Sequence, residues 1–190
     1  MFRFESRHVR WTLLFVAVLS AAWLSRRSNV AAQRDGASAE DRLRELKIAL
    51  PPVMQPKNTF VNVVRVGDLL YVSGTGPNPV EGKVPTGRLG DTMQTAEGRK
   101  VARSVGLQVL SVVKAELGSL DRVERLVKTL GMVNATADFK EHPLVINGFS
   151  DLMVEVFGDK QGKGARSAVG MASLPNGIPV EIEAIFQIRR

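Results

Sequence analysis

The sequence is short of the residues on which several kinds of site depend. Its 190 residues include no cysteine, two histidines and one tyrosine. Without cysteine the chain can form no disulfide, thiolate nucleophile or Cys-type zinc site. His142 is the only histidine outside the N-terminal segment, so we expect no metal site in the domain.

The charge is also unlike that of a nucleic-acid-binding surface. The net charge is +7, but no block of five or more like charges occurs, and aromatic residues make up 6% of the chain. Nucleic-acid binding requires a basic stripe, usually combined with aromatics on which bases stack. We therefore expect no nucleic-acid partner. Hydrophobic residues (44%) and charged residues (24%) are in the proportions of a globular protein with a core.

The N-terminal segment resembles a targeting signal. A basic opening precedes the uncharged run WTLLFVAVLSAAWL at residues 11–24, which is shorter than the ~20 residues of a membrane-spanning helix. Small-residue cleavage sites follow at residues 30–32 and 37–39. We predict an exported protein with a cleaved signal peptide. The alternative is an uncleaved anchor that attaches the protein to a membrane through residues 11–24.

The domain organisation follows from this segment. We predict a signal peptide or anchor at residues 1–32, a polar linker at residues 33–42 and one folded domain at residues 43–190.

Within the domain the hydrophobic periodicity changes several times. Residues 60–66 and 69–73 alternate around Gly67-Asp68, which predicts a β-hairpin. A helix capped by Asp91 or Thr92 follows and stops at Gly118. A strand is expected at residues 122–133, then a helix capped by Asp138 and stopped at Gly158, and two last strands. The order β-β-α-β-α-β-β predicts an α+β fold with two helices on one face of a mixed sheet.

The last two strands lie in GARSAVGMASLPNGIPVEIEAIF, which runs from Gly164 to Phe186. If Asn176-Gly177 forms a two-residue turn, these strands pair as a hairpin in which Ala172 faces Glu181. One face then carries Val169, Met171, Val180, Ile182, Ala184, Phe186 and Ile188 and packs on the helices. The other carries Arg166, Ala168, Gly170, Ala172, Glu181, Glu183 and Gln187.

This register separates the two most distinctive charged residues. Arg166 and Glu181 would lie about 20 Å apart in one chain, too far to share a small ligand. A site that uses both therefore requires an oligomer in which different copies supply them. The alternative is that both are solvated surface groups.

The same residues resemble a known family. YVSG at residues 71–74, INGFSDL at residues 146–152 and ARSAVGMASLPNGIPVEIEAI at residues 165–185 resemble the RidA/YjgF (reactive intermediate deaminase, endoribonuclease L-PSP-like) family, in a less characterised branch of it. The resemblance runs from about Leu43 to the C-terminus. It implies a chorismate-mutase-like fold, assembled as a homotrimer with clefts between subunits.

The resemblance also implies an activity. Family members hydrolyse enamines and imines to 2-keto acids and ammonia, with no metal or cofactor. By position, Arg166 corresponds to the arginine that holds the substrate carboxylate and Glu181 to the glutamate that orients the attacking water. Asn147, Ser73 and Gly74 correspond to residues that line the cleft.

Two positions depart from the family pattern. Phe60 stands where many members have tyrosine, and Ala168 where many have cysteine. Both changes point to a substrate that is larger or less polar than the familiar one. Two other functions remain open: a non-catalytic trimeric module that binds a small carboxylate metabolite, and, less favoured, the endoribonuclease activity of the older family label.

Overall fold

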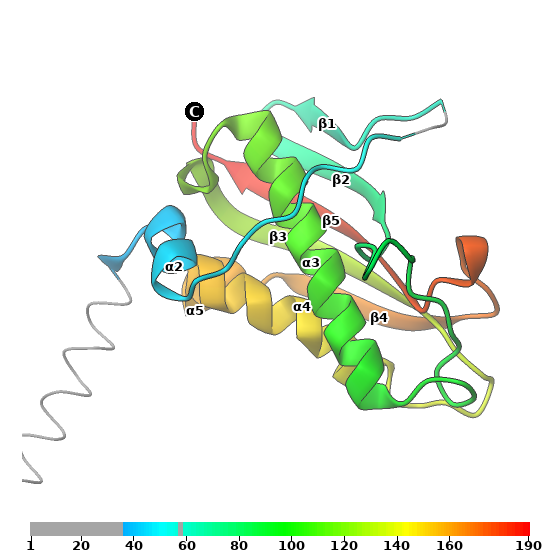
Figure 1. The fold of residues 1–190 in the computed structure, drawn as a ribbon. Coiled ribbons are helices and arrows are strands. Elements are labelled where there is room, and N and C mark those ends of the chain that lie inside the picture. The colour runs from blue at the N-terminus through cyan, green and yellow to red at the C-terminus, as the bar shows by residue number, and fades with distance from the viewer. Residues whose placement is uncertain (1–35, 57–58) are drawn as a thin grey trace, which may run out of the picture. The chain divides into compact units, whose positions relative to one another are not determined.

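The computed structural model describes residues 36–56 and 59–190 (Figure 1). The predicted signal peptide or anchor falls on residues that lie outside this part of the chain. Residues Ser38–Arg190 form one compact unit. Among the described residues, no helix has the length and apolar character needed to cross a membrane.

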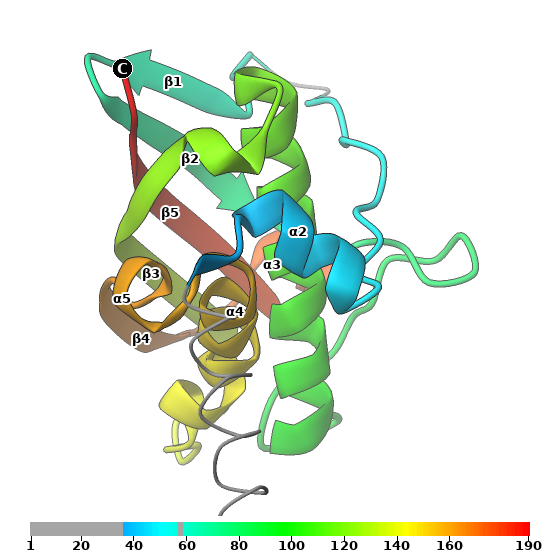
Figure 2. The same ribbon diagram turned by 90° about the vertical axis from the view of Figure 1, so that its left-hand side faces the viewer.

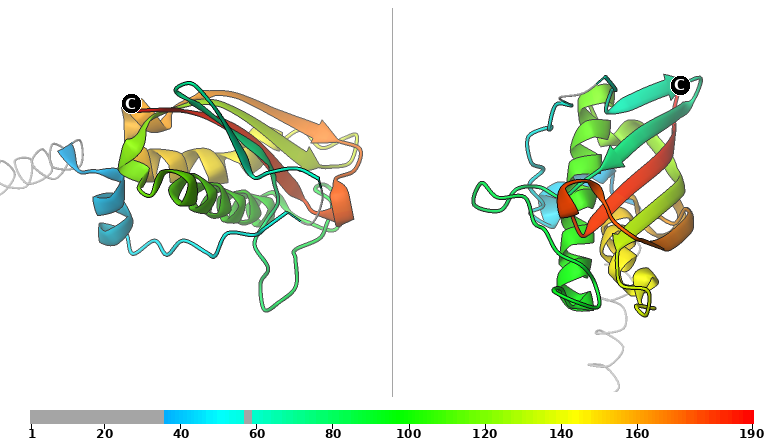
Figure 3. Two further views of the ribbon diagram at one scale, coloured as in Figure 1. Left: turned by 90° about the horizontal axis from the view of Figure 1, so that it is seen from above. Right: turned by 90° about the vertical axis from the view of Figure 1, so that its right-hand side faces the viewer.

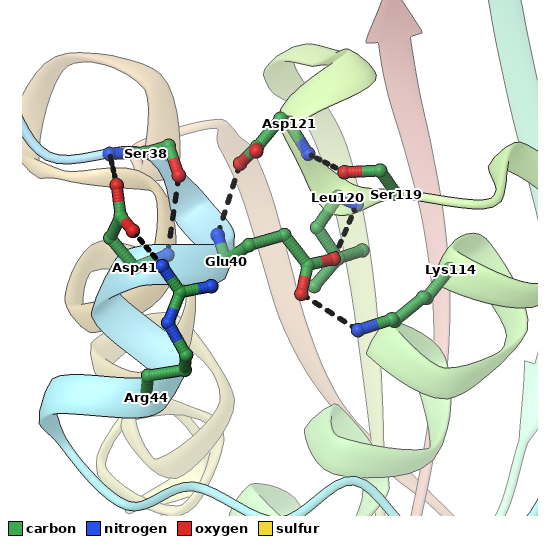
Figure 4. Close-up of polar contacts among 8 residues, drawn as sticks. All are labelled: Ser38, Glu40, Asp41, Arg44, Lys114, Ser119, Leu120 and Asp121. Carbon is green, nitrogen blue, oxygen red and sulfur yellow. Dashed lines mark hydrogen bonds and ion pairs between the residues drawn. The ribbon is translucent and has the colours of Figure 1, made fainter.

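The compact unit begins earlier than the sequence indicates. Residues 38–42 were expected in a polar linker, but residues 39–42 form most of helix α2 (Ala39–Glu45), and Ser38 caps its N-terminus. Ala39 and Leu43 are buried in the core. The Glu40 carboxylate accepts hydrogen bonds from Lys114 Nζ (2.7 Å) and from the backbone N–H of Leu120 (3.0 Å), as Figure 4 shows. These contacts attach α2 to the end of the long helix α3 (Thr95–Leu117) and to the residues that follow it.

The predicted α+β fold and its order of principal elements are confirmed. In the described part of the chain, five strands form one mixed sheet in the order β1-β2-β5-β3-β4. The bounds are β1 Val63–Val66, β2 Leu69–Thr75, β3 Val123–Asn134, β4 Ala165–Met171 and β5 Val180–Ile188. Strand β4 is parallel to β3, whereas β5 is antiparallel to both β2 and β3.

Two long helices, α3 (Thr95–Leu117) and α4 (His142–Phe157), cover one face of the sheet, and the other face is open (Figures 2 and 3). The expected stops at Gly118 and Gly158 are confirmed, and both glycines have positive φ angles. The expected caps are wrong, because α3 begins after Gln94 and α4 after Glu141. Shorter helical segments are η1 (Leu120–Arg122), α5 (Asp159–Gly162) and η2 (Pro175–Gly177).

Glycines let α4 approach both of its neighbours closely. A Cβ atom at Gly131 on β3 would lie 2.6 Å from the Ile146 side chain of α4. A Cβ atom at Gly148 on α4 would lie 2.0 Å from the backbone oxygen of Arg99 on α3. The fixed position of α4 matters for function, because this helix carries Asn147.

The predicted hairpin of the last two strands is wrong. Strand β4 pairs with β3 through a parallel crossover, with Arg166 beside Thr129. Strand β5 lies between β2 and β3 instead, with Glu181 beside Met132. The Pro-Asn-Gly sequence forms the 3-10 turn η2, with Asn176 at φ 55°, and not a two-residue hairpin turn. The chain uses this turn to pass from the sheet edge to its centre.

Candidate functional site

The true pairing changes which side chains share a face. Because paired residues in neighbouring strands point to the same side, Arg166 lies on the side of buried Thr129 and Ala184, which is the helix side. The predicted faces are therefore correct for β5, where Val180 to Ile188 alternate as expected, and inverted for β4. Ala168 and Gly170 face the helices, whereas Val169 and Met171 share the open face with Glu181 and Glu183.

The guanidinium of Arg166 is held by α4. Its Nη1 donates to Asn147 Oδ1 (2.8 Å) and to Ser150 Oγ (3.0 Å). Arg166 lies on an edge strand and is exposed. No described residue accepts a hydrogen bond from its Nη2 or Nε. One nitrogen is thus fixed in place while the other two are available to a carboxylate, which a guanidinium can grip with two parallel hydrogen bonds.

The second group lies on the open face. The Glu181 carboxylate lies directly over Gly74 on β2, where a Cβ atom would be 2.1 Å from its Oε1. Burial raises the pKa of Glu181, and the nearby Glu183 carboxylate raises it further. The Glu181 carboxylate therefore needs a glycine at position 74 for space. It also binds a proton more tightly than an exposed carboxylate would.

Arg166 and Glu181 lie closer than predicted, yet they do not meet. Three residues along the strands and two strand spacings separate their Cα atoms, which is about 14 Å and not the expected 20 Å. The side chains point to opposite faces of the sheet, so the hydrogen-bonded strands lie between them. One chain contains two half-sites: Arg166 with Asn147 on the helix side, and Glu181 with Gly74 on the open side.

The remaining predicted residues are divided between these regions. Ser73 donates to the backbone oxygen of Val61 (2.6 Å) and lines a cavity of 280 Å³ on the open face. Ala168 lies beyond Arg166 on the helix side and is half-buried against the core. Phe60 is 48% exposed and lines a different cavity next to α3, so it joins neither half-site within one chain.

Sequence reasoning missed two groups. Ser150 was detectable, because it lies three residues after Asn147 on a helix and therefore on the same face. Lys128 was not, because its place depends on strand pairing. It lines the cavity on the open face with Tyr71 and Glu183, and its Nζ donates to Ser167 Oγ (3.1 Å). Among the described residues, no three His, Asp or Glu side chains gather as metal ligands would.

The chain is similar to known proteins over most of its length. Protein TCP17 of Trypanosoma cruzi is 43% identical over 146 residues, which cover 77% of this chain and 91% of that protein. A 2-iminobutanoate/2-iminopropanoate deaminase of Dermatophagoides farinae is 29% identical over 144 residues, covering 74% of this chain and 94% of the deaminase.

A solved structure and a family profile agree with these relatives. The crystal structure of Atu1372 from Agrobacterium tumefaciens, a protein described as of unknown function, has a TM-score of 0.71 and 38% identity, over 84% of this chain and 99% of that one. The profile described as "YjgF/chorismate_mutase-like, putative endoribonuclease" matches residues 40–177. The chain therefore belongs to the RidA/YjgF family, has its chorismate-mutase-like fold, and lies in a less characterised, TCP17-like branch of it.

Proposed function

We propose that this protein hydrolyses reactive imines and enamines of amino acids at clefts shared by two copies of the chain in a homotrimer. In this reaction water adds to the carbon of the C=N bond, and the C–N bond then breaks. An imino acid and water give a 2-keto acid and ammonia, with no oxidation or reduction. The observation that carries the proposal is the placement of two residues on opposite faces of the sheet. Arg166 is suited to binding the substrate carboxylate, and Glu181 is suited to proton transfer.

Arg166 supports the substrate-binding part. The substrate is a 2-imino acid, whose carboxylate is planar and matches the two guanidinium nitrogens that Asn147 and Ser150 leave available. Because both partners sit on α4, the guanidinium is held in one orientation before substrate arrives. Such preorganisation lowers the entropy cost of positioning the C=N carbon for attack.

Glu181 supports the proton-transfer part. The attacking water must lose a proton and the leaving nitrogen must gain one, and a single carboxylate can do both in turn. A carboxylate whose pKa is raised accepts a proton from water more readily than an ordinary one. General base catalysis of this kind contributes about 10²- to 10⁴-fold to a rate.

The open face of the sheet supports the second copy. Four large apolar side chains on this face are exposed: Val64, Val66, Tyr71 and Val169. Val64 and Tyr71 line the same cavity as Lys128 and Glu183, and an exposed apolar area of this kind marks a contact surface. Packing against another copy would bury these side chains and bring Glu181 of one chain near an edge strand β4 of the next.

The deaminase name of the Dermatophagoides farinae relative agrees with this chemistry. The alternative is a trimeric module that uses the same cleft to hold a small carboxylate metabolite without turnover. The two are separated by measuring ammonia release and keto-acid binding on the same sample.

A complementation experiment tests the shared site. The full chain is tested for accelerated ammonia release from imines that an amino-acid oxidase generates in situ, with catalase removing the peroxide. Arg166→Ala and Glu181→Gln should each abolish the acceleration. When the two variants are mixed, unfolded and refolded together, one in four interfaces of a closed ring receives both intact residues, so about a quarter of the wild-type activity should return.

Two results would refute the proposal. The first is a wild-type protein that accelerates no imine in a panel of short and long side chains; Arg166-dependent binding of 2-keto acids in that case would establish the binding module. The second is a mixture that stays inactive while each variant retains the wild-type oligomeric state, because a site within one chain cannot be rebuilt by mixing.

A further inference from the structure

On the helix side of β4, the Arg166 half-site continues toward a second polar group that the mechanism does not use. His142, the first residue of α4, lies over Gly170, where a Cβ atom would be 2.5 Å from its Nε2. Its ring stacks edge-on against Phe139, with centroids 5.2 Å apart and an interplanar angle of 89°. Two contacts therefore fix the imidazole against the edge strand.

The imidazole is available to a ligand. It is half-buried, and no described residue makes a hydrogen bond to either ring nitrogen. Burial lowers the pKa of His142, and the positive charge of Lys140 lowers it further. The acid beside them, Glu141, directs its carboxylate to Thr95 Oγ1 on α3. The pole formed by His142 and Lys140 thus has a hydrogen-bonding ring and a nearby positive charge.

This pole is aligned with Arg166. Arg166 and Gly170 are both on the helix face of β4, four residues and about 13 Å apart, with only Ala168 between them on that face. Along α4, Asn147 and Ser150 lie about 8 Å and 12 Å beyond His142. Allowing one charge-assisted hydrogen bond of about 2.8 Å at each end leaves about 7 Å of the distance along β4, and about 2 to 6 Å of the distances along α4, for a ligand.

We infer that the strip from Arg166 past Ala168 to His142 selects a dicarboxylic 2-imino or 2-keto acid, with Arg166 holding the first carboxylate and His142 and Lys140 the second. This inference rests on the proposed function for the role of Arg166. A five-carbon dicarboxylate has four C–C bonds of about 1.5 Å between its carboxyl carbons, so it spans about 5 Å when extended. The reacting carbon stays next to Arg166, and His142 contacts only the second carboxylate of the ligand.

Calorimetry with two keto acids tests the inference without requiring turnover. 2-Oxoglutarate has the second carboxylate, and 2-oxohexanoate has an apolar chain of similar length. The full wild-type chain should bind 2-oxoglutarate about 10-fold more tightly, the worth of one charge-assisted hydrogen bond. His142→Phe keeps the ring against Phe139 but removes both nitrogens. It should abolish this preference by weakening 2-oxoglutarate alone.

Two further variants serve as controls. Gly170→Ala places a methyl group 2.5 Å from the His142 Nε2, so it should displace the imidazole and reproduce the loss caused by His142→Phe. Arg166→Ala should weaken both acids by the same factor, because both have the first carboxylate. His142→Gln, which restores a donor, should recover part of the preference.

The inference is overturned if the wild type binds both acids equally, if His142→Phe weakens both by the same factor, or if neither acid binds. These results leave the deaminase proposal standing when ammonia release from monocarboxylic imines is still accelerated. Conversely, selective binding of 2-oxoglutarate without any turnover supports this inference and removes the deaminase activity.

Discussion

The close crossing of α3 and α4 gives a prediction whose size can be worked out from the structure. In Gly148→Ala the new Cβ atom would lie 2.0 Å from the backbone oxygen of Arg99, 2.9 Å from its carbonyl carbon and 3.1 Å from Arg103 N. Ordinary contact begins near 3.4 Å, so the two helices must separate by about 1.4 Å. Backbone atoms cannot rotate out of the way as a side chain can.

We expect this overpacking to cost about 3 kcal/mol, the upper part of the usual range. Replacing glycine by alanine inside a helix offsets about 1 kcal/mol of that cost. The net loss of about 2 kcal/mol in the free energy of unfolding corresponds to a fall of about 4 to 8 °C in Tm for a domain of this size. Thermal unfolding followed by circular dichroism measures it.

Gly106→Ala is the matched control. Gly106 lies in α3 at the same helix interface, but its new Cβ atom would meet side-chain atoms, Cδ2 of Leu152 at 2.9 Å and Cδ2 of Phe149 at 3.2 Å. These can shift, and the gain in helix propensity is the same, so Tm should change by less than about 3 °C. A Gly148→Ala protein as stable as the wild type, or a Gly106→Ala protein that loses as much, would show that backbone contact does not set this crossing.

Four further predictions concern the half-sites. The folded state binds the Glu181 proton more tightly than the unfolded state does. The free energy of unfolding of unassembled chains should therefore fall as the pH rises from the ordinary pKa of 4.5 toward neutrality. In urea titrations Glu181→Gln should flatten that pH dependence. Glu183→Gln removes a like charge and should move the acid limb of kcat/KM to lower pH; an unmoved limb would exclude Glu181 as the titrating base. Gly74→Ala should displace the Glu181 carboxylate and lower kcat by at least about 10²-fold with little change in KM. Ser150→Ala frees the Arg166 guanidinium and should raise KM by about 3- to 10-fold, the worth of one hydrogen bond, with kcat nearly unchanged.

The sequence predicts the local elements well because their signals are local. The alternation around Gly67-Asp68 and the glycine stops at Gly118 and Gly158 depend on neighbouring residues alone. The helix starts were misplaced because Asp91 and Asp138 are good capping residues that happen to lie a few positions too early. Pro143, at the first turn of α4, was the better signal.

Strand pairing was harder, because periodicity shows which residues share a face of one strand but not which strand lies beside it. The assumed Asn176-Gly177 hairpin gave β4 the wrong neighbour and so the wrong face for Arg166. An edge strand such as β4 offers little correction, since residues on both of its faces, Arg166 and Val169 among them, are exposed. The family resemblance nevertheless named Asn147, which the structure brings to 2.8 Å from Arg166.

The separation of Arg166 and Glu181 by a sheet has a consequence for the concentration at which the protein works. No rotamer change, hinge or loop movement in a lone chain can bring the two groups together through hydrogen-bonded strands. If they act on one molecule of substrate, turnover per chain must disappear once the protein is diluted below the dissociation constant of its assembly. The reaction rate then rises more steeply than in direct proportion to the protein concentration.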